Sequence, residues 1–399
     1  MIEFELSPQQ MQLKEFLHWF AENQVRPASL EADKAHATPL PLLQQAKAMG
    51  LSMESVPSGG GPGGGEGGQG ERQGNRIGVI AAEELAWGDA SFVLNLPGAG
   101  LGGPPVRFMG TPEQKERFLS IFNGPELRWG AYALTEPEAG SDVAGIRTTA
   151  RKEGDHYILN GTKTFITNGA KASWNVVFAT VDRSLGRAGH RAFVVEKDTP
   201  GFRVGRIMDK MGLRASETAE LVFDNCVVPA ENLLGGEERY AQREGFKVAM
   251  QTFDSSRPTV AAMAVGIARA AYERAREIAR QNLMLGRPSP RYAAIVEQLA
   301  TMARKIDAAR LLVWKAAWMA DARVPNTKEA SMSKAYAGQI GMEVCSTAID
   351  VAAGAGLLHD EFLEKWFRDI KVYDIFEGTG QIQRLVVSRR IFDDLGVRV

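Results

Sequence analysis

Glycines are concentrated between Gly59 and Gly70, where nine of the twelve positions are glycine. Gly63, Gly65 and Gly68 match the GxGxxG spacing of loops that bind nucleotide phosphates through backbone N–H groups. Such loops join a strand to a helix, but no strand-like segment precedes this run and no Lys-Ser or Lys-Thr pair follows it. Composition alone produces the match in so dense a run, so we interpret it as a linker and look for a nucleotide site elsewhere.

Two polar, turn-rich stretches are further candidates for a binding site. The first reads YALTEPEAGSD from Tyr132 to Asp142, and the second reads NGTKTFITNG from Asn160 to Gly169. Each stretch alone fits ordinary turn chemistry, in which proline opens a loop, glycine adopts an unusual φ, and Ser or Asp side chains bind nearby backbone. Their occurrence together requires a more specific explanation, which is given below.

Metal and hydrolase chemistry have no support in the sequence. The histidines show neither metal-ligand spacing nor a HExxH pair, and there is no GxSxG motif. We interpret them as structural or surface residues: His18, His36, His156, His190 and His359. Cys226 and Cys345 are too few and too far apart for a disulfide framework or a cysteine metal site, so we expect buried, unpaired thiols in a reducing compartment.

The bulk composition indicates a large, nearly neutral protein. Its 399 residues are 44% hydrophobic and 24% charged, which allows the buried cores of two or three domains. A net charge of −1 gives no electrostatic reason to expect binding to nucleic acid or to an anionic membrane surface. The start MIEFELSPQQ lacks targeting features, and no apolar run approaches the roughly 20 residues that span a bilayer, so we predict a cytoplasmic protein without a membrane span.

Hydrophobic periodicity divides the chain into three parts. Ser7 and Gln10 predict a capping box that starts a helix. The buried face of that helix is expected to hold Leu13, Phe16, Leu17 and Phe20. Helical patterning continues to about Glu126, and it returns after Gly245 with long alanine-rich stretches. Segments typical of strands lie between: AYALTE, HYILNGTKTFIT, WNVVFATVD, RAFVVEKD, FRVGRI and ELVFDNCVV.

The expected fold class is therefore α+β. We predict an N-terminal helical domain over residues 1–129, a central antiparallel β-domain over 130–240 and a C-terminal helical bundle over 241–399. Glu153-Gly154 and Asn160-Gly161 are turn dipeptides, and Asn-Gly between apolar runs is the strongest short-range signal of a hairpin. The strands are expected to form a compact antiparallel sheet or barrel.

The two polar stretches together resemble the signature of the acyl-CoA dehydrogenase family. Similarity to this family extends along the chain through KMGLRASETAELVFDNCVVPAENLLG, GFKVAMQTFDSSRPTVAAMAVGIARAA and YDIFEGTGQIQRLVVSRR. The resemblance implies N-terminal helices, a central β-domain and a C-terminal four-helix bundle, in agreement with the periodicity. It also implies bound FAD and a CoA thioester substrate.

The resemblance also implies which residues bind these molecules. The cofactor contacts would be Tyr132, Leu134, Thr135, Gly140, Ser141, Phe165, Ile166, Thr167, Thr379 and Gln381. Among them Thr135 would lie at the pyrimidine edge of the flavin ring and Thr167 beside N5, while Phe165 matches an aromatic wall where many relatives carry Trp. The substrate contacts would be Ser141, Asp254, Arg257 and Gly378. Without the resemblance, Asp254 and Arg257 would be interpreted as a surface ion pair.

Glu377, in the segment IFEGTGQIQR, is the residue to which the resemblance assigns catalysis. Its simplest interpretation is a polar residue in a helix connection, with Gly378 ending one element and Thr379 capping the next. By resemblance it is the base that removes the α-proton of the thioester while a β-hydride passes to flavin N5. Its apolar neighbours suit this role, because desolvation raises a carboxylate pKa toward the working pH. Some relatives carry the base just before the bundle arginine, where this chain has Ser256.

Two positions depart from the family pattern. The arginine that a neighbouring subunit usually contributes to the FAD pyrophosphate is Asn282 here, and a glutamine before a GGxG turn is Asp350. Lost hydrogen bonds and a like charge should weaken the adenosine half of the site by several kcal/mol. Either a different, homologous subunit supplies the adenosine side in a heterotetramer, or Arg287 reaches back and restores it in a homotetramer.

The leading hypothesis is an FAD-dependent dehydrogenase that converts an acyl-CoA into the 2-enoyl-CoA and passes electrons to an electron-transfer flavoprotein. The alternative is a catalytically silent partner subunit of a heteromeric acyl-CoA dehydrogenase, which Asn282 and Asp350 favour and the retention of Glu377 opposes. An acyl-CoA oxidase, with oxygen as acceptor, is a closer variant of the first hypothesis. The length and branching of the acyl group are left open.

Overall fold

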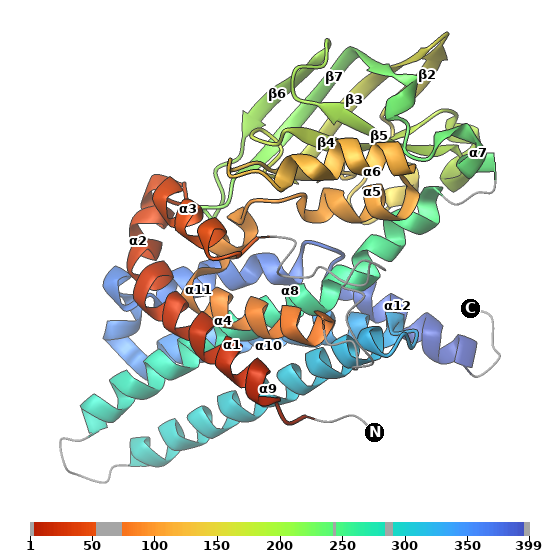
Figure 1. Cartoon of the computed structure of the whole chain (residues 1–399). Helices are drawn as coiled ribbons and strands as arrows, with labels where there is room; N and C mark the ends of the chain where they lie inside the picture. Colours follow the sequence, from red (N-terminus) through yellow and green to blue (C-terminus); the bar gives the residue numbers. More distant parts are fainter. Residues whose placement is uncertain (1–3, 53–73, 242–244, 284–289, 395–399) are drawn as a thin grey trace.

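The computed structural model describes residues 4–52, 74–241, 245–283 and 290–394. The glycine-rich run between Gly59 and Gly70 lies outside the described residues, and so does Arg287. Within the described part, helices come first, a sheet follows, and helices end the chain (Figure 1). This order confirms the predicted α+β fold class, whereas the domain boundaries given above remain predictions.

The N-terminal part is helical. Its helices are α1 (Pro8–Phe20), α2 (Arg26–Ala35), α3 (Leu40–Ala48), α4 (Gly74–Asn95), α5 (Gly103–Met109) and α6 (Pro112–Leu119). The capping box of α1 is confirmed: Gln10 N–H donates to Ser7 Oγ, and Ser7 N–H donates to Gln10 Oε1. Leu17 and Phe20 are fully buried, but Phe16 is 42% exposed, so its predicted burial is wrong. The apolar stripe of α1 is narrower than expected. Phe16 precedes Leu17 directly, so its side chain is rotated about 100° around the helix axis from that of Leu17.

Seven strands form one sheet above the helical layer (Figure 1). They are β1 (Gly130–Ala133), β2 (Thr149–Glu153), β3 (His156–Thr167), β4 (Trp174–Thr180), β5 (His190–Glu196), β6 (Phe202–Ile207) and β7 (Thr218–Pro229). The neighbour order is β1-β4-β2-β3-β7-β6, and β5 pairs with β4. Most pairs are antiparallel, but β1 and β2 each pair with β4 in parallel. All six predicted segments form strands, and β2 is the strand that the sequence analysis did not predict.

The Asn160-Gly161 dipeptide is not a turn, so the hairpin predicted there is wrong. Both residues lie inside β3, at a shift in its register against β7 that marks a β-bulge. Gly161 has a φ of +154°, and a Cβ atom there would lie 2.4 Å from Thr148 Oγ1. The glycine therefore permits a close approach of two backbones. The predicted turn at Glu153-Gly154 is present, because it joins β2 to β3.

The C-terminal part is again helical. Its helices are α7 (Gly236–Ala241), α8 (Gly245–Leu283), α9 (Pro290–Asp321), α10 (Thr327–Ala352), α11 (Leu363–Ile370) and α12 (Gly380–Asp394). Small residues let these helices approach others closely: a Cβ atom on Gly266 of α8 would lie 2.3 Å from the Glu83 carbonyl oxygen of α4. By length and composition alone, the stretch Thr327–Leu357 could cross a membrane, but in this fold it is a bundle helix that packs on α8, α9 and α12.

Two hydrophobic cores hold the molecule together. The first joins the N-terminal helices α1, α3 and α4 to α8, α9, α10 and α11, so the two helical parts share one core. The second lies between the sheet and helices α5 and α6 (Figure 1). Cys345 belongs to the first core and Cys226 to the second; both are fully buried and unpaired, as predicted.

Candidate active site

The two polar motifs lie side by side: the first begins in β1 and continues into the loop after it, and the second begins within β3 and ends just after it. Thr164 N–H donates to the Thr135 carbonyl oxygen at 2.9 Å. Lys163 Nζ donates to the Leu134 carbonyl oxygen, also at 2.9 Å. These bonds fix the backbone on both sides of the Thr135 side chain, which is only partly buried. The two sequence motifs therefore meet in space.

A buried ion pair supports this junction. Lys163 Nζ lies 2.7 Å from Glu136 Oε1, and the Glu136 carboxylate also accepts hydrogen bonds from the backbone N–H groups of Arg147 and Thr148. Burial lowers the pKa of Lys163 to about 8, although the charge of Glu136 acts to raise it. Burial also acts to raise the pKa of Glu136, but Lys163 and these hydrogen bonds hold it below its ordinary value. The pair anchors the loop after β1 to β3.

Phe165 projects from the sheet into solvent. It is 65% exposed, and its φ of +56° is unusual for a residue other than glycine. A second bulge of β3, between Lys163 and Ile166, produces this conformation. Ile166 is buried in the sheet core, so its side chain is a core side chain, whereas Thr167 is partly exposed. An exposed aromatic side chain on a strained backbone, two residues before a partly exposed threonine, is typical of a ligand-binding surface.

The other predicted cofactor residues differ in how far they are exposed to solvent. Gly140 and Ser141 are exposed, and a Cβ atom on Gly140 would meet no atom within 4 Å. Leu134 is buried in the core, so only its backbone could contact a ligand. Thr379 caps α12 by accepting a hydrogen bond from Ile382 N–H at 3.3 Å, as expected for the simplest interpretation of this segment. Gln381 is exposed in the first turn of α12.

Glu377 occupies a tight turn just before α12. Its φ is +54° and that of Gly378 is +94°, so both residues are in the left-handed region. Lys334 Nζ of α10 donates to the Gly378 carbonyl oxygen at 2.7 Å, and Gln383 Nε2 donates to the carbonyl oxygens of both Glu377 and Gly378 at 3.1 Å. A Cβ atom on Gly378 would lie 2.3 Å from the end of the Gln383 side chain, and the φ of +94° itself favours glycine at this turn. The turn therefore fixes the direction of the Glu377 side chain.

The Glu377 carboxylate lies among polar groups of the bundle. Ser256 Oγ of α8 donates to Glu377 Oε2 at 2.5 Å. Burial raises the pKa of Glu377, although the Ser256 hydrogen bond and the charges of Lys334 and Arg257 act to lower it. Lys334 is 1% exposed, and burial lowers its pKa to about 8 against the attraction of Glu377 and Asp374. A carboxylate with a raised pKa in a fixed position is a candidate for a general base.

Tyr132 links this carboxylate to the sheet. Its ring lies 5.5 Å from that of Phe253 on α8 and 5.1 Å from that of Phe178 on β4. Burial raises the pKa of Tyr132 well above its ordinary value, and the negative charge of Glu377 contributes to this shift. The predicted base and a predicted flavin contact therefore come together where the sheet meets the bundle, although they are far apart in the sequence.

Arg257 lies inside the bundle, so its interpretation as half of a surface ion pair is wrong. Its side chain is 6% exposed, and its Nη1 donates to Ser331 Oγ at 3.4 Å. The side chains of Asp254 and Asn282 lie outside the described part of the structure. Asp350 is exposed at the end of α10.

Several residues that hold the site together were not among the predicted site residues: Glu136, Ser256, Lys163, Lys334 and Gln383. Glu136 and Lys163 belong to the two motifs, so a role for them could have been anticipated. Lys334 was also recognisable in the sequence. It lies within the segment SMSKAYAG, whose small residues indicate a closely packed helix, and a lysine buried in such a helix needs a polar partner. Ser256 was noted only as the position where some relatives carry the base, and no comparable signal identifies Gln383.

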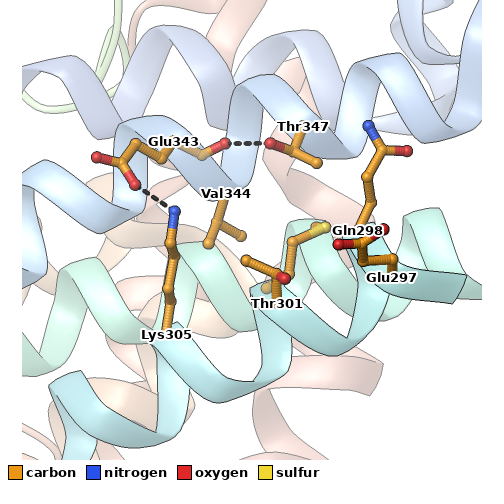
Figure 2. Close-up of a pocket in the computed structure, with 8 residues that line it drawn as sticks. Glu297, Gln298, Thr301, Lys305, Glu343, Val344 and Thr347 are labelled. Carbon is orange, nitrogen blue, oxygen red and sulfur yellow. Dashed lines mark hydrogen bonds and ion pairs between the residues drawn. The ribbon is translucent and has the colours of Figure 1, made fainter. Parts of the chain in front are cut away.

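A surface cavity of about 200 Å³ between α9 and α10 is separate from this site. Figure 2 shows its lining, in which Lys305 Nζ lies 2.5 Å from Glu343 Oε2. None of the residues predicted for the site lines this cavity. Within the described residues, no group of three or more His, Cys, Asp or Glu side chains is placed to hold a metal ion.

Family models match nearly the whole chain in the order that the fold shows. The N-terminal, middle and C-terminal domain models of acyl-CoA dehydrogenase match residues 7–122, 131–226 and 243–392, respectively. The chain therefore belongs to the acyl-CoA dehydrogenase family. It is an oxidoreductase of a family whose members are flavoproteins.

Individual relatives agree with this assignment. The chain is 37% identical over 397 residues to the short-chain specific acyl-CoA dehydrogenase of Clostridium acetobutylicum, a match that covers 98% of this chain and 100% of that protein. The solved structure of butyryl-CoA dehydrogenase from Megasphaera elsdenii is similar with a TM-score of 0.87 and 37% identity, covering 98% of this chain and 100% of the other. A chain in a structure described as the electron transferring flavoprotein of Acidaminococcus fermentans has a TM-score of 0.85 and 39% identity, covering 98% and 99%.

Proposed function

We propose that this chain is an FAD-dependent dehydrogenase that converts a short-chain acyl-CoA into the corresponding 2-enoyl-CoA, with Glu377 as the base. The observation that carries the proposal is the Glu377 carboxylate itself: it is fixed by a left-handed turn, has a raised pKa and is close enough to Tyr132 to influence its ionisation. A carboxylate at this junction can act on a ligand that lies between the sheet and the bundle.

The residues present fit the isoalloxazine end of FAD. An exposed Phe165 ring provides an aromatic face, Thr135 and Thr167 provide accessible hydroxyls, and open space at Gly140 leaves room for a planar group. These residues, together with Tyr132, would hold the flavin. When bound, FAD supplies the acceptor for the β-hydride of the substrate.

The protein's own contribution is proton removal. A thioester α-carbon is a weak acid, so the base must be ionised at the working pH and close to the α-proton. Burial raises the pKa of Glu377, which makes it a stronger base, while Ser256 and Lys334 favour its ionised form. The Glu377 carboxylate would take the α-proton, and the fixed turn would keep it directed at that carbon.

The substrate class and the acceptor follow from the relatives. Two of the most similar proteins are described as short-chain specific and butyryl-CoA dehydrogenases, so we propose a short acyl group. Ser141, Asp254, Arg257 and Gly378 are the proposed contacts of the CoA thioester. The similarity to a structure described as an electron transferring flavoprotein supports such a protein as electron acceptor. A cytoplasmic location is part of the same proposal.

A second candidate function is a subunit that depends on a homologous partner for its cofactor. The observation that favours it is the pair of departures at the expected adenosine side, Asn282 and Asp350, of which Asp350 is exposed and acidic. A carboxylate repels a pyrophosphate, and asparagine cannot form the bidentate contact of arginine. In this case the chain would contribute Glu377 and the flavin-ring side to a heterotetramer; in the first, a homotetramer would suffice.

One experiment tests both candidates. The chain is purified alone, its FAD content per protomer is measured, and it is titrated anaerobically with butyryl-CoA. We expect bound FAD to lose its yellow colour on titration, and the Glu377→Gln variant to bind FAD but react at least about 100-fold more slowly. Near-full FAD occupancy excludes the partner-dependent subunit. Full-rate bleaching by the Gln variant contradicts the assignment of Glu377 as base.

A further inference from the structure

Ser256 forms a direct hydrogen bond with the proposed base. It is 2% exposed, and its Oγ lies 2.5 Å from Glu377 Oε2 and 3.4 Å from the Phe253 carbonyl oxygen of its own helix. The two partners are 121 residues apart in the chain, so the bond joins α8 to the turn before α12. A hydrogen bond from a buried hydroxyl to a partly buried carboxylate is a charge-assisted contact.

We propose that Ser256 is a positioning residue for the reaction: its hydroxyl orients the Glu377 carboxylate and keeps it ionised in the free enzyme. This inference rests on the proposed function, in which Glu377 is the base. A hydrogen bond to Oε2 restricts rotation of the carboxylate, and the lone pairs of Oε1 can still accept a proton. Ser256 would thus select the oxygen that meets the substrate.

The charges around Glu377 explain why this hydroxyl matters. Lys334 of α10 and Arg257 of α8 favour the ionised carboxylate, whereas burial disfavours it. Among the residues that the structure describes, the other ionisable groups that act on this cluster are Tyr132 of β1 and, on the segment of Glu377 itself, Tyr373 and Asp374. Lys334 also donates to the Gly378 carbonyl oxygen, so a change at this lysine would disturb the turn as well as the charge near the carboxylate. Removal of the Ser256 hydroxyl therefore changes the surroundings of the Glu377 carboxylate while leaving the hydrogen bonds of the turn backbone in place.

The test compares Ser256→Ala with a matched serine. Ser333 of α10 is also fully buried and donates to the carbonyl oxygen three residues earlier, at 2.9 Å, but no described contact joins it to Glu377. The FAD-loaded wild type and the variants Ser256→Ala, Ser256→Thr and Ser333→Ala are assayed for kcat/KM with butyryl-CoA between pH 5 and pH 9. Exchange of the substrate α-proton for deuterium is followed by NMR over the same range, because exchange requires the base but no net oxidation.

Removal of the hydroxyl should raise the pKa of Glu377, because the lost hydrogen bond favours the charged form. We expect the acidic limb of both profiles to move to higher pH by about one unit in Ser256→Ala, which is about a tenfold loss of rate below that limb. Ser256→Thr should restore the limb, and Ser333→Ala should leave it in place.

The outcomes separate this inference from the proposed function. An unchanged acidic limb in Ser256→Ala, or an equal shift in Ser333→Ala, overturns the role of Ser256. If Ser256→Ala proves too unstable to assay, a wild-type limb in Ser256→Cys, which is a weak donor, overturns it as well. Undiminished α-proton exchange in Glu377→Gln instead removes the base, and with it the proposed function.

Discussion

At the scale of single residues, the exposure and backbone conformation of Phe165 do not contribute to the stability of the protein without a ligand. An aromatic ring that is 65% exposed contributes little burial, and its left-handed backbone costs free energy. Both features are reasonable if the ring stacks on a bound flavin. The cost would then be offset in the complex.

We therefore predict that Phe165→Ala weakens FAD binding by about 3- to 10-fold, the effect of one lost aromatic contact, without lowering the melting temperature of the apoprotein. Titration of the apoprotein with FAD, monitored by flavin fluorescence, measures the first effect. Phe165→Trp should retain binding. Leu185→Ala, at an exposed apolar position of the same domain, is the control and should bind FAD as the wild type does. Equal FAD affinity in Phe165→Ala and wild type would exclude the stacking role.

The motif residues were predictable from sequence, but their supports were only partly so. Thr135, Phe165 and Glu377 lie in motifs that the sequence identifies on its own. Ser256 and Lys334 act across the bundle, and contacts of that kind depend on which helix faces meet. Hydrophobic periodicity predicts which face of a helix is buried, but it does not predict which other helix packs against that face. The proposed carboxylate contact could therefore be found only from the arrangement of α8, α10 and the turn before α12.

At the scale of elements, the bulge in β3 determines how the second motif reaches the site. Gly161 sits where β3 shifts its register against β7, with the Thr148 backbone and side chain directly beside it. The shift changes the face to which the following residues point, and these include Lys163 and Phe165. A change at Gly161 should therefore affect both stability and the site.

Gly161→Ala should lower the stability of the protein by about 1 to 3 kcal/mol, because the added methyl group clashes with Thr148 and alanine rarely adopts a φ of +154°. The thermal unfolding midpoint is the measurement. Gly124→Ala provides the control, since a Cβ atom there would meet no atom within 4 Å. A midpoint within 1 °C of wild type for Gly161→Ala would show that the bulge relaxes easily.

The elements themselves were mostly predictable. Strong apolar alternation and capping signals identified α1 and six strands, whereas β2 was missed because its sequence TARKE is short and charged. The Asn160-Gly161 error has a physical cause: a glycine needed for close packing and a glycine needed for a turn look alike in a sequence. Which requirement applies depends on the neighbouring strand, and here that neighbour is the segment containing Thr148.

At the scale of the whole molecule, a buried ion cluster joins the N-terminal helices to the bundle. Glu84 of α4 is bound by Arg269 of α8 and by His18 of α1, and the adjacent Glu83 is bound by Arg269 and by Arg310 of α9. Burial acts to raise the pKa of Glu84, but Arg269 and His18 hold it at about 2. The two carboxylates of α4 therefore connect this helix to three others: α1, α8 and α9.

The depressed pKa makes the stability pH-dependent in a defined direction. The contribution of Glu84 is complete above its unfolded pKa of about 4.5 and is lost as the pH falls toward 2, which amounts to about 3 kcal/mol. Glu84→Gln should be less stable than wild type at pH 7, and its midpoint should fall less steeply between pH 5 and pH 3. Thermal scans over this range measure both effects.

The control for this prediction is Glu277→Gln. Glu277 also forms an ion pair on α8, with Arg280, but at the surface. Its loss should change the midpoint little at any pH, because exposed pairs are weak. Equal pH slopes for Glu84→Gln and wild type would show that the buried cluster is not the acid-sensitive element.

The core shared by the first and last helices has a consequence for synthesis on the ribosome. Helix α4 ends at Asn95, but its packing partner α8 extends to Leu283, so at about 5 to 20 residues per second the early helices wait roughly 10 to 40 s for that partner to emerge. During this interval the face of α4 that packs on α8 is uncovered, while the sheet can already pair its own strands. A nascent chain stalled before α8 should therefore recruit chaperones to its N-terminal helices.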